Sequence, residues 1–195
     1  MILDEHIHDE DRGFAGGYII QTAADQPYGI AAFAGGWGRD ISDVVDNYGH
    51  LAGCWITGED PPEADNRIAF SDTERDAYGL PVPTLHYRDH ENSVAMREHA
   101  ARQSESIYES LGAEQMVTRP NVGHGCHNMG TARMSERPAD GVTNKWGRVH
   151  DVPNLFVSDG STFTTSAAPN PTLTIVALGI RQAEHIAAAM QRRDL

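Results

Sequence analysis

The sequence predicts an α+β fold, with a mostly antiparallel sheet in the first part of the chain and helices in the second. Short runs of β-type residues separated by Gly and Pro dominate positions 1–88. Two longer helical patterns occupy much of positions 89–195. The length of 195 residues is typical of one domain. We therefore expect two layers of secondary structure in a single domain.

Four strands are predicted in the first part of the chain. Gly16–Thr22 and Gly53–Thr57 are short runs of strand-forming residues that begin at glycine. Arg67–Phe70 and Pro83–Tyr87 flank a polar stretch that contains Asp76–Gly79. These last two runs predict a hairpin with a long loop.

Two helices are predicted in the second part. The first begins at Asp89 or Asn92, which can cap it, and ends at Gly112. The last helix runs from about Pro171 to Arg192, where a basic end favours the helix dipole. The residues expected on their apolar sides are Val94, Ala101, Tyr108 and Leu111 in the first helix, and Ile175, Leu178, Ile186 and Met190 in the last.

Two further short strands are predicted between these helices. One is Glu114–Thr118, and the other is the apolar run Asn154–Ser158. A division after residue 119 separates a β-rich region with one helix (1–119) from a segment that carries most of the chemically suggestive motifs (120–195).

Composition and charge exclude several classes of partner. The chain has 15 Lys and Arg against 28 Asp and Glu, a net charge of −13, whereas nucleic-acid binding needs a basic surface. No run approaches the roughly 18 apolar residues of a membrane span. The start of the chain is acidic, unlike a secretory signal, so we expect a cytoplasmic location by default. Cys54 and Cys126 provide no disulfide framework.

The first motif that suggests chemistry is Gly123–Thr131. Its glycines place the imidazole of His127 on tight backbone that another molecule can approach closely. An imidazole pKa of about 6.5 suits proton abstraction near neutral pH. Two alternatives stay open: a histidine with a structural role only, and a zinc site formed with His124 and Cys126. Zinc is less favoured, because ligands spaced by two and one residues rarely complete a tetrahedron.

Two further motifs allow both a structural and a functional interpretation. Asp159 and Gly160 follow an apolar run, where they offer a carboxylate and N–H groups to a cofactor or form an ordinary turn. Asn170 as N-cap and Pro171 as first helical residue predict a helix start. That helix start either is only a cap or directs free N–H groups and a positive dipole end at an anion.

Taken together, these motifs resemble the C-terminal part of the glucose-methanol-choline (GMC) family of flavin oxidoreductases. The order is His-x-x-Gly-Thr at 127–131, Asn-Leu-Phe-Val-Ser-Asp-Gly-Ser at 154–161 and Asn-Pro-x-x-Thr at 170–174. The histidine and the aspartate are 32 residues apart, and the aspartate and the asparagine are 11 apart. Within the family, Cys126–Met134 and Arg148–Leu155 are most similar to sugar and sugar-acid dehydrogenases.

The resemblance implies an activity and a set of site residues. His127 matches the histidine that takes the proton from the substrate hydroxyl, and Asn170 matches the residue that hydrogen-bonds the reacting oxygen. The implied reaction moves a hydride from a carbon that bears a hydroxyl to N5 of FAD. The residues implied to contact the cofactor are Asp159, Gly160, Asn170, Pro171 and Thr172.

One part of the family pattern has no counterpart in the sequence. The family binds FAD with an N-terminal Gly-x-Gly-x-x-Gly unit, and the run Gly36–Ile41 lacks the third glycine. We therefore expect the C-terminal piece of a longer enzyme, inactive alone, whose last strand and helix complete an absent FAD-binding domain. Ser135 and Thr164 also depart from the family pattern, where glycine and proline are common.

The expected partners follow from the same resemblance. They are a small alcohol or sugar substrate, the missing FAD-binding half and an electron-acceptor protein. The alternative function is a non-catalytic carbohydrate- or partner-binding module derived from such an enzyme, with a zinc protein as a third interpretation.

Overall fold

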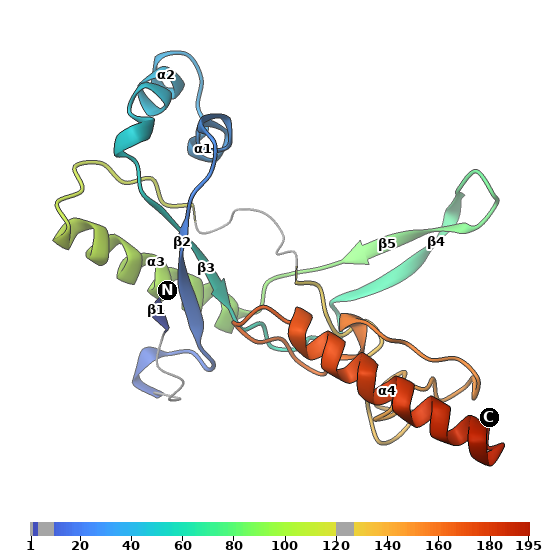
Figure 1. Cartoon of the computed structure of the whole chain (residues 1–195). Coiled ribbons are helices and arrows are strands. Elements are labelled where there is room, and N and C mark those ends of the chain that lie inside the picture. Colours follow the sequence, from blue (N-terminus) through green and yellow to red (C-terminus); the bar gives the residue numbers. More distant parts are fainter. Residues whose placement is uncertain (1, 4–9, 120–126) are drawn as a thin grey trace. The chain divides into compact units, whose positions relative to one another are not determined.

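The computed structural model describes residues 2–3, 10–119 and 127–195, and it confirms the α+β class (Figure 1). The described part of the chain also contains short 3₁₀ helices at Glu10–Arg12, Tyr48–His50 and Gly160–Thr162. The strands and α-helices in chain order are β1 (Ile2–Leu3), β2 (Tyr18–Ala23), α1 (Pro27–Ala34), α2 (Arg39–Asp46), β3 (Gly53–Gly58), β4 (Arg67–Arg75), β5 (Pro81–His86), α3 (Glu91–Ser110) and α4 (Thr172–Arg192).

The chain forms two compact units, each made of two separate stretches. The first unit is Met1–Gly58 with Val94–Gly123, and the second is Glu59–Ser93 with His124–Leu195. The division after residue 119 was drawn from motifs rather than from compactness, and it stays a prediction.

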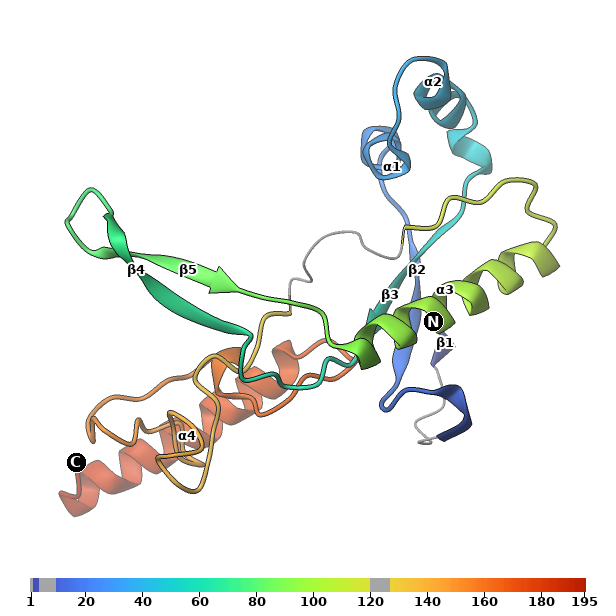
Figure 2. The same ribbon diagram turned by 180° about the vertical axis from the view of Figure 1, so that it is seen from behind.

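The first unit is an antiparallel sheet in the order β1-β2-β3, with α3 packed against it (Figure 2). The register pairs Tyr18 with Gly58 and Ile20 with Ile56. The hydroxyl of Tyr18 is 2.9 Å from Nδ1 of His99 on α3. The buried residues of this core are Phe14, Tyr18, Ile20, Met96 and Ala100. The predicted strands Gly16–Thr22 and Gly53–Thr57 are thus confirmed; the first begins two residues later than predicted, and each ends one residue later.

The helix predicted from Asp89 or Asn92 is confirmed as α3, but half of its predicted apolar side is wrong. Ala101 is buried, whereas Val94 and Leu111 are exposed. The buried side is set by Met96 and Ala100, which meet β2, together with two serines, Ser93 and Ser104. A prediction based on large apolar residues therefore misses the small residues that are buried in this helix.

Two short helices were not predicted, and one predicted strand does not form. α1 and α2 lie side by side in the connection that leads from β2 to β3 (Figure 1). The ring of Phe33 on α1 meets Trp55 of β3 edge-on, with centroids 5.6 Å apart. Helices of eight residues depend on such packing, because they are too short to be stable alone. The segment Glu114–Thr118 is irregular, with no ladder partner for its backbone among the described residues.

The second unit begins with the hairpin β4–β5. The register runs from Arg67 opposite His86 to Phe70 opposite Pro83, and it becomes irregular before Arg75. In the turn, Oδ1 of Asp76 accepts hydrogen bonds from the N–H groups of Tyr78 and Leu80, at 2.8 and 2.9 Å. The predicted hairpin with a long loop is confirmed, with a first strand longer than expected.

Most of the chain between residue 127 and α4 is irregular but densely hydrogen-bonded. The predicted strand Asn154–Ser158 does not form, and Phe156 makes one isolated bridge with Arg148. Thr143 lies fully buried in this segment, bridged on either side to Met134 and Val149. The backbone polar groups of the loop are therefore paired within the loop rather than in a sheet.

The predicted last helix is confirmed as α4, and Gln182 attaches it to the irregular segment. The buried side-chain amide of Gln182 donates to the carbonyl oxygens of Trp146 (2.9 Å) and Val157 (2.8 Å). Around it, Arg181 lies over the Trp146 ring, 4.1 Å from the centroid, and His185 stacks on the same ring at 4.3 Å. We call Trp146, Arg181, Gln182 and His185 the Trp146 clamp. On the predicted apolar side of the helix, Ile175, Leu178 and Ile186 are half-buried, whereas Met190 is exposed.

Gly147 tests how closely the clamp is packed. A Cβ there would lie 2.6 Å from the backbone oxygen of Val157, and its φ of 71° disfavours any side chain. We expect Gly147→Ala to destabilise the chain by about 2–4 kcal/mol, since strain and overpacking add. The control is Gly79→Ala, where φ is 80° but nothing lies within 4 Å. Urea unfolding measures both variants, and equal losses would contradict the close packing.

The amide of Gln182 provides a second test. We expect Gln182→Met, which keeps the length but removes both donors, to lower the free energy of unfolding by about 2–3 kcal/mol, because two carbonyl groups lose their partners. Gln191→Met makes the same change at an exposed position of the same helix. Thermal and urea unfolding compare the two, and a neutral Gln182→Met would show that the clamp does not depend on these bonds.

Candidate functional site

The three sequence motifs come together in the second unit, around the 3₁₀ helix Gly160–Thr162. The N–H groups of Gly130, Ala132 and Met134 donate to the carbonyl oxygens of Gly160, Ser161 and Thr162, at 3.2, 2.8 and 2.8 Å. These alternating bonds align the segment that follows His127 with the segment that follows Asp159. The first two motifs are therefore neighbours, although 32 residues separate their key side chains.

Gly160 connects this pair of segments to the start of α4. A Cβ on Gly160 would lie 3.4 Å from Cγ of Met129 and 3.4 Å from Cδ1 of Ile175. It would also lie 3.6 Å from the carbonyl oxygen of Asn128. The backbone of Gly160 therefore packs between the residues after His127 and the first turns of α4, where there is little room for a larger side chain.

The side chain of Asp159 caps the 3₁₀ helix. Its Oδ1 accepts from the N–H of Ser161 at 2.8 Å and from the Ser161 hydroxyl at 2.5 Å. The hydroxyl bond, and then the N–H bond, lower the pKa of Asp159 from its ordinary value of 3.8, while slight burial acts in the opposite direction. The structure thus shows the turn interpretation of Asp-Gly. It leaves the carboxylate charged and exposed, so a cofactor-binding role stays a prediction.

His127 lies half-buried at the beginning of the second described stretch. Within the described residues, its ring makes no hydrogen bond. His124 and Cys126, the other residues of the zinc alternative, lie outside the described residues. Across residues 10–119 and 127–195, no group of three or more His, Cys, Asp or Glu side chains is arranged to hold a metal.

The predicted N-cap role of Asn170 is wrong. The N-cap of α4 is Pro171, and no side chain caps the helix. The first intrahelical bond runs from the N–H of Ile175 to the carbonyl of Pro171, 3.0 Å. Asn170 is exposed in the loop before the helix. The first-turn N–H groups of α4 therefore have no intrahelical or side-chain partner among the described residues, which is the donor set that an anionic group needs.

The loop before α4 is anchored by Ser166. Its hydroxyl accepts from the N–H of Asp60 at 2.8 Å and lies 3.2 Å from the carbonyl of Asp60. This contact joins the loop that carries Asn170 to the segment that precedes the β4–β5 hairpin. Sequence reasoning missed it, because the two partners are 106 residues apart.

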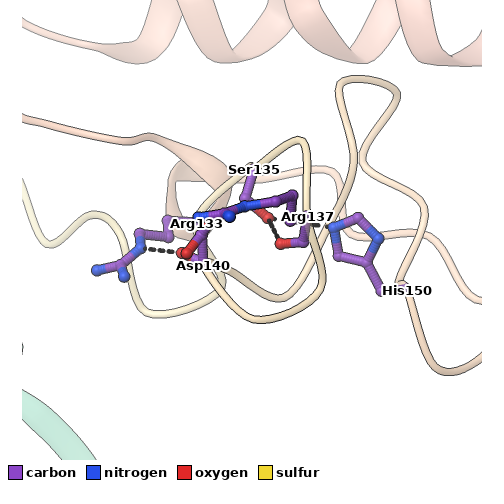
Figure 3. Close-up of polar contacts among 5 residues, drawn as sticks. All are labelled: Arg133, Ser135, Arg137, Asp140 and His150. Atoms are coloured by element: carbon purple, nitrogen blue, oxygen red, sulfur yellow. Dashed lines mark hydrogen bonds and ion pairs between the residues drawn. The ribbon is translucent and has the colours of Figure 1, made fainter.

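Ser135, which departs from the family pattern, organises the loop after Met134 (Figure 3). Its hydroxyl donates to the carbonyl of Arg137 at 2.7 Å and lies 3.1 Å from Nε2 of His150. A hydroxyl has one proton, so this network requires Nε2 of His150 to be the donor. That nitrogen cannot then accept a proton from Ser135. The Ser–His pair is a structural contact rather than an activated nucleophile.

Two arginines contact Asp140 and complete this loop, one through an ion pair and one through a hydrogen bond to its backbone. Nε of Arg137 lies 2.6 Å from Oδ2 of Asp140, and Nε of Arg133 donates to the carbonyl oxygen of Asp140 at 2.7 Å (Figure 3). Both arginines are exposed. Their contacts with Asp140 hold the shape of the loop.

Over the part of the chain that the structure describes, no helix combines the length and the apolarity needed to cross a bilayer.

Comparison with known proteins identifies the family. Residues 62–179 match the C-terminal domain model of the family described as GMC oxidoreductase. The 2-methyl-1,2-propanediol dehydrogenase of Mycolicibacterium austroafricanum is 35% identical over 192 residues, which cover 91% of this chain and 34% of that protein. The C-glycoside 3-oxidase of Arthrobacter globiformis is 36% identical over 129 residues, 64% of this chain and 25% of that protein.

A third relative extends the comparison to an enzyme subunit. The fructose dehydrogenase large subunit of Gluconobacter japonicus is 29% identical over 167 residues, 85% of this chain and 31% of that protein. The chain thus spans about a third or less of the length of these curated relatives. Because the family model covers more than half of the chain and the motifs converge in one unit, the chain belongs to the GMC oxidoreductase family.

Proposed function

We propose that this chain is the C-terminal part of an FAD-dependent oxidoreductase that acts on the CH–OH group of an alcohol or a sugar. The observation that carries the proposal is the convergence of the His127 segment, Asp159 and the start of α4 around Gly160. The relatives named above are enzymes of an alkanediol, a C-glycoside and fructose, which supports a CH–OH donor as substrate.

The residues present fit a flavin cofactor in two respects. The charged carboxylate of Asp159 suits a hydroxyl donor such as those of FAD. The uncapped first turn of α4 suits the negative charge that a reduced flavin carries. Asp159, Gly160, Asn170, Pro171 and Thr172 would hold the cofactor, and the chemistry that bound FAD supplies is hydride acceptance at N5.

In this proposal the chain's own residues handle the substrate hydroxyl. His127 takes the O–H proton while the neighbouring C–H bond breaks with its electron pair, so that a carbonyl product forms. Asn170 donates a hydrogen bond to the reacting oxygen and holds it near the base. As a general base, the imidazole of His127 acts in its neutral form.

The proposal also needs a flavin-binding half, supplied with or beside this chain. Consistent with that need, α4 has an exposed apolar stripe, formed by Leu173, Val176 and Ile180, at helix positions opposite Gln182. Exposed apolar stripes of this kind usually mark an interface. We propose that the flavin-binding half covers this stripe, and that an electron-acceptor protein or a small acceptor reoxidises the enzyme.

The role of His127 can be tested in the completed enzyme, meaning this chain together with a flavin-binding half. We expect His127→Ala to leave flavin content unchanged and to slow flavin reduction by substrate about 10²–10⁴-fold, as loss of a general base does. The measurement is anaerobic stopped-flow bleaching of the flavin. The control is His86→Ala, an exposed histidine of β5. Equal reduction rates for wild type and His127→Ala would refute the assignment.

A charge introduced at Asn170 tests whether this residue lies next to the flavin. Because its side chain does not cap α4, we expect Asn170→Asp to leave the melting temperature unchanged. A carboxylate next to a reduced flavin would disfavour the reduced state by on the order of 1–4 kcal/mol, lowering the reduction potential and slowing hydride transfer. Asn170→Ser, which adds no charge, should have a smaller effect.

The control for Asn170→Asp is Asn154→Asp, the same change at another exposed position of the second unit. Redox titration and stopped-flow reduction of the completed enzyme compare the variants. If Asn170→Asp and Asn154→Asp give the same potential and the same rate, Asn170 does not face the flavin.

A further inference from the structure

Only one of the two carboxylate oxygens of Asp159 accepts hydrogen bonds from the described residues. Oδ1 accepts both the N–H of Ser161 at 2.8 Å and the hydroxyl of Ser161 at 2.5 Å. Among the described residues, Oδ2 accepts no hydrogen bond. Two donors on one oxygen fix the rotation of the carboxylate, so the second oxygen has a defined direction.

The second of these bonds is more than a helix cap requires. One acceptor for the N–H of Ser161 is enough to cap the short 3₁₀ helix Gly160–Thr162. The hydroxyl bond orients the exposed carboxylate and stabilises its charged form. A charge-assisted bond of 2.5 Å is at the short, strong end of O–H···O contacts.

Ser161 also contacts the segment that follows His127. Its carbonyl oxygen accepts the N–H of Ala132 at 2.8 Å. The neighbouring bonds, from Gly130 to Gly160 and from Met134 to Thr162, hold the same alignment on both sides. One residue therefore ties Asp159 by its side chain and the His127 segment by its backbone.

We propose that Ser161 is a positioning residue. It fixes the orientation of the Asp159 carboxylate through Oδ1, so that Oδ2 can accept a hydrogen bond from a hydroxyl group of the bound FAD. The proposal rests on the proposed function, because it assigns the ligand of Oδ2. The serine itself needs no contact with the cofactor. Its effect on binding passes entirely through the carboxylate that it orients.

The first part of the test uses the chain alone and needs no flavin. NMR titration of the carboxyl carbons follows the pKa of Asp159 in wild type, Ser161→Ala and Ser161→Thr. Ser161→Ala removes the hydroxyl but keeps the N–H and the carbonyl, and Ser161→Thr keeps all three. We expect the pKa of Asp159 to rise toward its ordinary value in Ser161→Ala and to stay low in Ser161→Thr.

The matched control is Ser158→Ala. Ser158 is the exposed serine on the other side of Asp159, and its hydroxyl makes no hydrogen bond to that carboxylate in the structure described. We expect Ser158→Ala to leave the pKa of Asp159 unchanged. Thermal melts of all variants verify that each chain is folded before its titration is compared.

The second part measures the FAD dissociation constant of the completed enzyme. We expect Ser161→Ala to weaken FAD binding about tenfold, Ser161→Thr to restore it, and Ser158→Ala to have no effect. Tenfold is the scale of losing one oriented, charge-assisted hydrogen bond. Asp159→Asn should weaken binding at least as much, and adding Ser161→Ala to it should cause no further loss, since the two changes act through one carboxylate.

The outcomes separate this proposal from the proposed function. An unchanged Asp159 pKa in Ser161→Ala would overturn the proposal, whatever the enzyme does. A raised pKa with unchanged FAD affinity would also overturn it, because the pair would then be a cap and nothing more. A completed wild-type protein that binds no flavin would refute the proposed function itself, and with it any role of Ser161 toward FAD.

Discussion

The side-chain amide of Gln182 is the interaction on which the second unit depends. It is buried and donates to two carbonyl groups that belong to different turns of the irregular segment. That segment has little regular structure, so each of its backbone groups needs a specific partner. The amide of Gln182 supplies two N–H groups to backbone carbonyl oxygens, which in a sheet would be bonded to a neighbouring strand. Val157, one of its two acceptors, lies two residues before Asp159, so the clamp also places the carboxylate.

The sequence predicted the longer regular elements and missed the short helices α1 and α2, for physical reasons. β2, β3, the β4–β5 hairpin, α3 and α4 were predicted, because apolar periodicity and turn residues are local signals. The strand expected at Asn154–Ser158 has an apolar pattern, but its backbone bonds to nearby loops, where Val149 donates to Leu155 and Val157 donates to Gly147. An apolar run predicts that its side chains are buried. It does not predict which distant segment, if any, pairs with its backbone to form a strand.

The candidate site shows the same division between local and non-local information. The types and order of the motif residues were visible in the sequence, including Ser161 directly after Asp-Gly. That the Ser161 hydroxyl would turn to Asp159 was not visible, nor was the ladder from Gly130 to Gly160. The error on Asn170 is instructive, because Asn-Pro is a favourable helix start by statistics. The helix begins one residue later than predicted, and its first turn is left without a side-chain cap.

An uncapped helix start is a loss of local stability that α4 can tolerate because other contacts hold it. Ile175 packs near Gly160 one turn into the helix, and Gln182, Arg181 and His185 engage Trp146 two turns further on. These contacts fix the helix axis independently of its first turn. The N–H groups at the start, which have no partner among the described residues, can then keep a constant direction. Under the proposed function, this is the property that a site for developing negative charge needs, because donors already in place require no reorganisation when the charge appears.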